Sequence, residues 1–228
     1  MKPVIEVRSL GRHYGAGDTL IKALSDVNIV IEPGEFTAIV GPSGSGKSTL
    51  LQLIGGLDIP NDGTVLLKGK AISDMSGQEL SDFRRDHIGF IFQAYNLIPV
   101  LSAAENCEYI MLLQGVSTVE RKERVYKMLA EVGLEGKESR LPGQLSGGQQ
   151  QRVAVARAMV SQPDIILADE PTANLDSQTG MELLDMMHDL NRNEGMTFVF
   201  STHDPKIMDR ASRLIHIQDG QVIKDETR

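Results

Sequence analysis

The chain has 228 residues, enough for one α/β domain with its own core. No apolar run approaches the roughly 20 residues needed to cross a bilayer. The net charge of −8 argues against broad binding to nucleic acid or anionic lipid, and the single cysteine, Cys107, excludes an intrachain disulfide or a cysteine-based metal cluster.

The N-terminal part, residues 1–35, is expected to alternate short strands with turns, marked by Gly11, Gly15 and Gly17. Residues 1–7 alternate like an edge strand and contain no apolar core of a signal peptide. We therefore expect the protein to be made and kept in the cytoplasm.

A phosphate-type loop follows this part. Phe36–Val40 predicts a strand and Lys47–Ile54 predicts a helix. The stretch between and into them fits G-x-x-x-x-G-K-[ST] at every position. The residues expected to bind a nucleotide here are Gly41, Pro42, Ser43, Gly44, Ser45, Gly46, Lys47, Ser48 and Thr49.

The chemistry of a triphosphate explains these residue types. Glycine at 41, 44 and 46 lets backbone N–H groups approach the phosphates, and the helix points its positive dipole end at them. Lys47 adds a charge that reaches the β- and γ-phosphates, and Ser48 offers a hydroxyl to Mg²⁺. The alternative is a glycine-rich turn with a surface lysine, which the strand–loop–helix context disfavours.

The later elements predict a parallel α/β core interrupted by helices. Strands are expected at Thr64–Leu67, Ile88–Phe92, Ile165–Ala168 and Thr197–Ser201, helices at Glu120–Val132, Gln150–Val160 and Thr179–Leu190, and a terminal hairpin at Leu214–Gln218 with Val222-Ile223. No strand is expected in residues 94–160, so this stretch is predicted to be the helical insert.

Two further motifs carry polar groups that suit a nucleotide. Leu145–Gln149, with Gly147-Gly148 at a helix start, predicts a second anion site. Asp169 ends a continuous apolar run, where α/β sheets place ligands. Glu170, one residue further, suits a base that polarises water. A solvated acidic turn before Pro171 is the alternative.

These motifs resemble, in kind and in order, those of the ABC ATPases. The matches are Tyr14 to the adenine-stacking tyrosine, Gln93 to the Q-loop glutamine, Leu145–Gln149 to the signature, Asp169 to the Walker B aspartate, Ala173–Asp176 to the D-loop and His203 to the switch histidine. The closer resemblance is to the group that contains LolD, MacB and FtsE, on Gly55–Asp58, Asn96–Pro99 and Leu167–Thr172.

The resemblance implies a RecA-like P-loop NTPase core with an N-terminal antiparallel β part and an inserted α-helical subdomain. One ABC ATPase domain is expected over 1–228, with the core in 1–93 and 161–228 and the helical subdomain in 94–160. It also implies a homodimer that sandwiches two ATP molecules, since the signature of one protomer caps the nucleotide on the other.

The site residues follow from the same resemblance. Catalysis is expected to involve Glu170, His203, Gln93 and Lys47; Mg²⁺ to be held by Ser48, Gln93 and Asp169; and ATP to be bound by Tyr14, the phosphate loop and the partner's copies of Ser146, Gly147, Gly148 and Gln149.

The expected activity is ATP hydrolysis that drives an integral membrane permease for export or lipoprotein release, with the subunit peripheral on the cytoplasmic face of the inner membrane. Alternatives are a force-transmitting ATPase that regulates cell-wall hydrolysis and, less favoured, a soluble ABC ATPase that acts on DNA or ribosomes. The apolar stretch Ala94–Leu113 is expected to hold the coupling surface, with Leu97, Ile98 and Val100 lining a groove for a permease helix.

Overall fold

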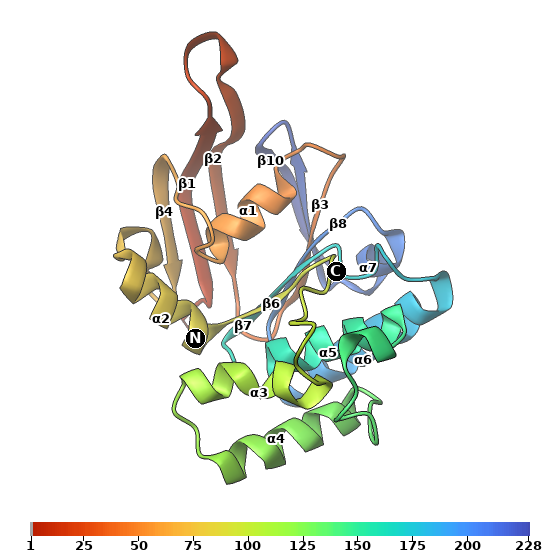
Figure 1. Cartoon of the computed structure of the whole chain (residues 1–228). Coiled ribbons are helices and arrows are strands. Elements are labelled where there is room, and N and C mark those ends of the chain that lie inside the picture. The colour runs from red at the N-terminus through yellow and green to blue at the C-terminus, as the bar shows by residue number, and fades with distance from the viewer. Residues whose placement is uncertain (1) are drawn as a thin grey trace.

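The computed structural model describes residues 2–228 and contains two sheets (Figure 1). The four-stranded sheet has the order β2-β1-β4-β5, and the six-stranded sheet has the order β10-β9-β3-β8-β7-β6. The strands are β1 (Ile5–Tyr14), β2 (Ile21–Ile31), β3 (Phe36–Val40), β4 (Asp62–Leu67), β5 (Lys70–Ala71), β6 (Ile88–Ile91), β7 (Ile165–Asp169), β8 (Phe198–Thr202), β9 (Arg213–Gln218) and β10 (Gln221–Thr227).

Seven helices are described in the same residues. They are α1 (Lys47–Ile54), α2 (Gly77–His87), α3 (Ala103–Leu113), α4 (Thr118–Glu131), α5 (Gly147–Met159), α6 (Ser177–Glu194) and α7 (Pro205–Arg210). Three of them, α3, α4 and α5, lie in the stretch expected to be helical. Within residues 2–228 no helix is both long and apolar enough to span a bilayer.

The six-stranded sheet is covered on both faces, which explains its continuous apolar strands. Along β3, Phe36, Ala38 and Val40 pack with the helices α3–α7, whereas Ile39 packs with α1 and the four-stranded sheet. Figure 1 shows the same layers, with α1 between the two sheets and α3–α6 on the far side. Cys107 is fully buried in the helical layer, and this burial raises the pKa of its thiol to about 12, so the thiol stays protonated at neutral pH.

The parallel strands place the functional segments at one edge. β9, β3, β8, β7 and β6 are neighbours in this order and run in the same direction. The segments that follow Val40, Ile91, Asp169 and Thr202 therefore leave the sheet side by side, at the carboxyl ends where α/β folds bind ligands.

The N-terminal part differs from the prediction in two respects. β1 and β2 are long strands of 10 and 11 residues, and Gly11 lies inside β1 beside a register shift rather than in a turn. β1 pairs with both β2 and β4, so it is an inner strand and not an edge strand. Its polar alternation arises because only one face of this sheet packs on α1. Met1 lies outside the described residues.

Candidate active site

The phosphate loop joins β3 to α1, as predicted, and its shape depends on glycine. Gly44 and Gly46 have φ angles of +78° and +104°, in the left-handed region that side chains disfavour. A Cβ on Gly46 would lie 2.6 Å from the Ala23 carbonyl oxygen, and one on Gly41 would lie 2.1 Å from that of Ile217. Glycine is therefore required at positions 41 and 46 by the neighbouring strands, whether or not a ligand is bound. Of the three loop glycines Gly41, Gly44 and Gly46, Gly44 alone has open space around an added Cβ.

Lys47 folds back over this loop. Its side chain is largely buried, and Nζ donates hydrogen bonds to the carbonyl oxygens of Gly41 and Pro42, both at 2.9 Å. These contacts hold the ammonium group within the curve of the loop, at the start of α1. The charge and the helix N-terminus therefore act on the same space.

Ser48 and Asp169 bring two oxygen ligands together. Ser48 Oγ donates to Asp169 Oδ1 at 3.0 Å, although 121 residues separate them in the sequence. In residues 2–228 no cluster of three or more His, Cys, Asp or Glu residues could hold a metal ion by itself. One carboxylate and one hydroxyl do fit Mg²⁺, because this ion is usually bound by one or two protein oxygens together with substrate phosphates.

Glu170 and His203 form the polar wall of the site. Glu170 Oε1 lies 2.7 Å from His203 Nδ1, and Glu170 Oε2 accepts a hydrogen bond from Thr202 Oγ1 at 3.2 Å. Glu170 is in the left-handed region, with a φ of +46°, and its N–H donates to the Ser201 carbonyl oxygen at 2.9 Å. The Glu170 side chain is 16% exposed and that of His203 is 72% exposed, so the carboxylate is largely buried and the imidazole faces solvent.

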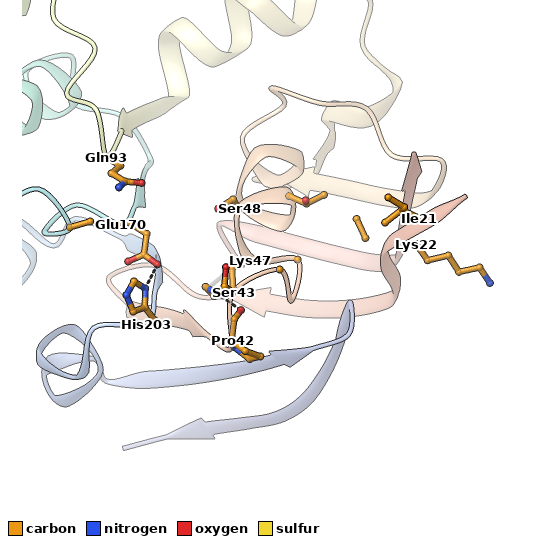
Figure 2. A pocket seen from close by; sticks show the side chains of 14 residues that line it. Ile21, Lys22, Pro42, Ser43, Lys47, Ser48, Gln93, Glu170 and His203 are labelled. Carbon is orange, nitrogen blue, oxygen red and sulfur yellow. Dashed lines mark hydrogen bonds and ion pairs between the residues drawn. The ribbon is translucent and has the colours of Figure 1, made fainter. Parts of the chain in front are cut away.

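Gln93 lies across from this wall, beyond the end of β6. Its carbonyl oxygen accepts a hydrogen bond from Asn174 Nδ2 at 2.8 Å, which ties it to the segment after Glu170. Figure 2 shows the Gln93 amide near Glu170, with Ser48 and Lys47 further along the same cavity.

Most of these groups line one pocket of about 750 Å³, within the size range of small-molecule sites, whereas the predicted residues Gly41, Ser45 and Asp169 are not in its lining. The predicted residues that line it are Pro42, Ser43, Gly44, Gly46, Lys47, Ser48, Thr49, Gln93, Glu170 and His203. Four lining residues were not predicted as site residues: Ile21, Lys22, Ala23 and Ala173. Lys22 lies at the rim with its ammonium group pointing away from Lys47 (Figure 2), and Ile21, a residue that is 67% exposed, adds an apolar side chain. Such a pocket suits a polyanion that carries a flat apolar group.

Tyr14 lies beside the pocket and not in its lining. It pairs with Ile21 across β1 and β2. Its hydroxyl donates to Asp58 Oδ2 at 2.9 Å, and the Arg12 guanidinium lies 4.5 Å from its ring centroid. Since Arg12 also forms an ion pair with Asp58, the Tyr14 ring and hydroxyl both contact this pair, which holds the side chain in place.

The signature residues lie outside this pocket, at the start of α5. Ser146 caps α5: its Oγ accepts from the Gln149 N–H at 3.3 Å, and Gln149 Oε1 accepts from the Ser146 N–H at 3.1 Å. None of Ser146, Gly147, Gly148 and Gln149 is among the residues that line the 750 Å³ pocket. The fold therefore does not bring the two predicted anion sites of one chain together.

Comparison with known proteins decides the family. A family model described as ABC transporter matches residues 24–173. The chain belongs to the ABC transporter family. The macrolide export ATP-binding/permease proteins MacB of Hyphomonas neptunium and Escherichia coli are 48% and 47% identical over 98% and 99% of this chain. The chain spans about a third of these relatives' length, 34% and 35%.

Solved structures confirm the predicted ABC ATPase fold. The dimeric structure of the ATP-binding cassette MJ0796 in a post-hydrolysis state, bound to ADP and Pi, has a TM-score of 0.90 and 43% identity, covering 98% of both chains. A second dimeric structure of MJ0796, described as a bacterial ABC transporter cassette, has a TM-score of 0.90 and 44% identity.

Three of the four unpredicted lining residues, Ile21, Lys22 and Ala23, open β2 and belong to no motif. Ala173 lies in the turn after Glu170 and begins the D-loop match, which was not assigned to the site. The pairing of β1 with β2 places Ile21 opposite Tyr14. The hairpin partner of the predicted tyrosine, Tyr14, is therefore the signal that would have pointed to Ile21, Lys22 and Ala23.

Proposed function

We propose that this chain binds ATP and Mg²⁺ in the 750 Å³ pocket and hydrolyses ATP as a homodimer that drives a membrane permease. The observation that carries the proposal is the edge of the six-stranded sheet, where the phosphate loop and the Glu170–His203 pair line one cavity and Asp169 is hydrogen-bonded to the lining residue Ser48. The similarity to the MacB export ATP-binding/permease proteins and to the ADP- and Pi-bound cassette MJ0796 supports it.

The binding step uses charge and shape. Lys47 and the N-terminus of α1 face the pocket, so they attract the triphosphate and neutralise its charge. Lys22 is exposed at the rim, with its ammonium group pointing away from Lys47 (Figure 2), and adds a weaker attraction that salt screens. Tyr14 and Ile21 offer an aromatic and an aliphatic surface at the β1–β2 end of the pocket for the adenine.

The metal site consists of Ser48, Asp169 and Gln93. Ser48 Oγ and Asp169 Oδ1 already lie 3.0 Å apart, and Gln93 lines the same pocket. A bound Mg²⁺ would supply charge neutralisation on the β- and γ-phosphates. The residues' own part is to hold their oxygens in position from α1, from the end of β7 and from the segment after β6.

Hydrolysis needs a base and an in-line water. Glu170 accepts a proton from the attacking water as the oxygen–phosphorus bond forms and the bond to the β-phosphate oxygen breaks. His203 lies beside Glu170, with an exposed imidazole that can reach the γ-phosphate. Lys47 balances the charge that develops on the transferred group.

A second protomer completes each site. The signature at Ser146–Gln149 is remote from its own phosphate loop, so it is free to cap the nucleotide bound by a partner copy. Two copies then bury two ATP molecules, each between one phosphate loop and one signature. ATP closes this dimer and hydrolysis reopens it.

The permease would dock on the helical subdomain that we propose for residues 94–160. A groove of about 300 Å³ between β6 and this stretch is lined by Phe90, Phe92, Ile98, Tyr109 and Arg157, among others. Burial lowers the pKa of the Arg157 guanidinium, whose Nη2 donates to the Tyr95 carbonyl oxygen two residues after Gln93. This contact links the groove to the ATP pocket. Through the permease, the subunit would sit on the cytoplasmic face of the inner membrane.

Only one of the three residues expected in that groove lines it. Ile98 does, whereas Leu97 packs against the helical core and Val100 is 80% exposed outside the groove. Ile98→Asp is therefore the sharper test: the isolated variant should stay folded and bind ATP, while association with the permease is lost. Unchanged association would place the coupling surface elsewhere.

The function itself is tested with two variants. Glu170→Gln should bind ATP and form the ATP-dependent dimer but lose at least about a hundredfold in turnover, because an amide cannot take the proton. Lys47→Ala should lose nucleotide binding or turnover. Glu123→Gln, at an exposed position on α4, is the matched control. A wild-type rate in Glu170→Gln would exclude Glu170 as the base.

A further inference from the structure

One buried hydroxyl holds the carboxylate of Glu170. Thr202 is the last residue of β8 and is fully buried. Its Oγ1 accepts a hydrogen bond from the Asp204 N–H at 2.9 Å and donates one to Glu170 Oε2 at 3.2 Å. The direction of both bonds is fixed, because a backbone N–H can only donate and the hydroxyl has a single proton.

A second threonine fixes the far end of this network. Asp204 Oδ1 accepts from the Lys206 N–H at 2.9 Å and caps α7, while Asp204 Oδ2 accepts from Thr172 Oγ1 at 3.0 Å. Thr172 follows Glu170 by two residues and is buried as well. The network therefore joins the segment after Glu170 to the segment after His203.

The backbone of Glu170 is held from the same strand. Its φ of +46° is unfavourable for a residue with a side chain, and its N–H donates to the carbonyl oxygen of Ser201, the neighbour of Thr202. The end of β8 thus fixes both the main chain and one carboxylate oxygen of Glu170. The other oxygen, Oε1, faces the exposed His203 in the pocket.

We propose that Thr202 is a positioning residue for ATP hydrolysis: its hydroxyl holds Glu170 Oε2 so that Oε1 is the oxygen presented to the attacking water. This inference rests on the proposed function of Glu170. Without the hydroxyl, the carboxylate can rotate about its side-chain bonds, and the fraction of time in the productive orientation falls.

The test compares four variants of the full-length chain. Thr202→Val removes the hydroxyl at nearly constant volume, Thr202→Cys keeps a weak donor, Thr202→Ser keeps the hydroxyl, and Thr172→Val makes the same chemical change in the same network without touching Glu170. Steady-state kcat and KM for ATP, ATP-dependent dimer formation by size exclusion, and thermal unfolding are measured for each.

We expect Thr202→Val to lower kcat by about ten- to a hundredfold while KM changes by less than about threefold. Its ATP-dependent dimer should be at least as abundant as that of the wild type, because bound ATP is hydrolysed more slowly. Thr202→Ser should restore kcat to within about threefold, Thr202→Cys should be intermediate, and Thr172→Val should lower kcat by less than about threefold.

Three outcomes would overturn the inference: a wild-type kcat in Thr202→Val, an equal loss in Thr172→Val, or a loss of ATP-dependent dimer that parallels the loss of turnover. If Thr202→Val does not fold, Thr202→Cys decides, and a wild-type kcat there is equally fatal. A wild-type chain without ATPase activity, or one whose rate survives Glu170→Gln, would instead contradict the proposed function.

Discussion

Two glycine-rich helix starts in this molecule look alike in sequence and differ in structure. α1 begins after Gly46, which has a left-handed φ of +104° and no side chain to cap the helix. α5 begins after Ser146, whose hydroxyl and backbone exchange hydrogen bonds with Gln149. The first leaves its N–H groups to a ligand, whereas the second satisfies part of its own.

The glycines of the two starts also face different neighbours. A Cβ at Gly41 or Gly46 would meet backbone carbonyl oxygens of adjacent strands, which cannot move without disturbing the sheets. A Cβ at Gly147 or Gly148 would meet the ends of the Tyr95 and Thr179 side chains. The phosphate loop is thus a rigid cradle, while the signature is a self-capped surface that another molecule can approach.

The largest expected effect tests whether the two starts work in trans. Ser146→Arg homodimers and Lys47→Ala homodimers should both be inactive, because each lacks half of every site. A mixed dimer has one intact composite site and should regain a clear fraction of wild-type ATPase activity. If the mixture never exceeds either homodimer, nucleotide binding to the mixture tells whether the sites fail to form in trans or one site cannot turn over alone.

A smaller expected effect is a difference in the free energy of unfolding between alanine substitutions at Gly46 and at Gly148. Gly46→Ala is expected to lower the free energy of unfolding by about 2–4 kcal/mol, from the left-handed φ together with the contact to the Ala23 carbonyl oxygen. Gly148→Ala should cost less than about 2 kcal/mol, because Thr179 can shift. Chemical denaturation measures both, and equal losses would contradict the difference between a rigid and a yielding neighbour.

Removing the cap of α5 should have a modest effect on stability alone. Ser146→Ala is expected to cost about 1 kcal/mol, a fall of about 2–4 °C in the unfolding midpoint for a chain of this size. The N-terminus of α1 has no equivalent side chain to remove. Thermal unfolding of the monomer without nucleotide checks this, and an unchanged midpoint would mean that the capping box contributes nothing measurable.

The smallest effect concerns charge. Lys22 lines the nucleotide pocket, and no lysine or arginine belongs to the signature segment at Ser146–Gln149. Lys22→Gln should raise KM for ATP by about two- to threefold at low salt, and the difference should fade as salt screens the exposed ammonium. A KM that is unchanged at low salt would exclude Lys22 from phosphate binding.

The sequence predicted the elements that are both strongly patterned and locally punctuated. β3 and α1 have the predicted bounds. The glycine-rich loop between them marks where the apolar pattern of the strand ends and the helical pattern begins. α2 was not predicted, although Ser76 and Glu79 form a capping box at its start. Most of its residues are polar or charged, and the two buried apolar residues, Leu80 and Phe83, are too few to give a clear helical periodicity.

The long strand β1 shows why local pattern failed in the N-terminal part. Its register shifts near Gly11 and its pairing with both β2 and β4 depend on residues far along the chain, such as Asp62. No local propensity encodes which strands will flank it, so inner and edge positions look alike in sequence.

What the sequence determined by itself was the set of functional groups and their short spacings, on which the proposals for phosphate binding, Mg²⁺ binding and proton transfer are based. The tertiary structure alone decided which of them meet. Ser48 reaches Asp169 across 121 residues, Thr202 reaches Glu170 across 32, and the signature stays outside the pocket of its own chain. Such contacts depend on the order of strands in the sheet, and this order results from packing the whole chain rather than from any one segment.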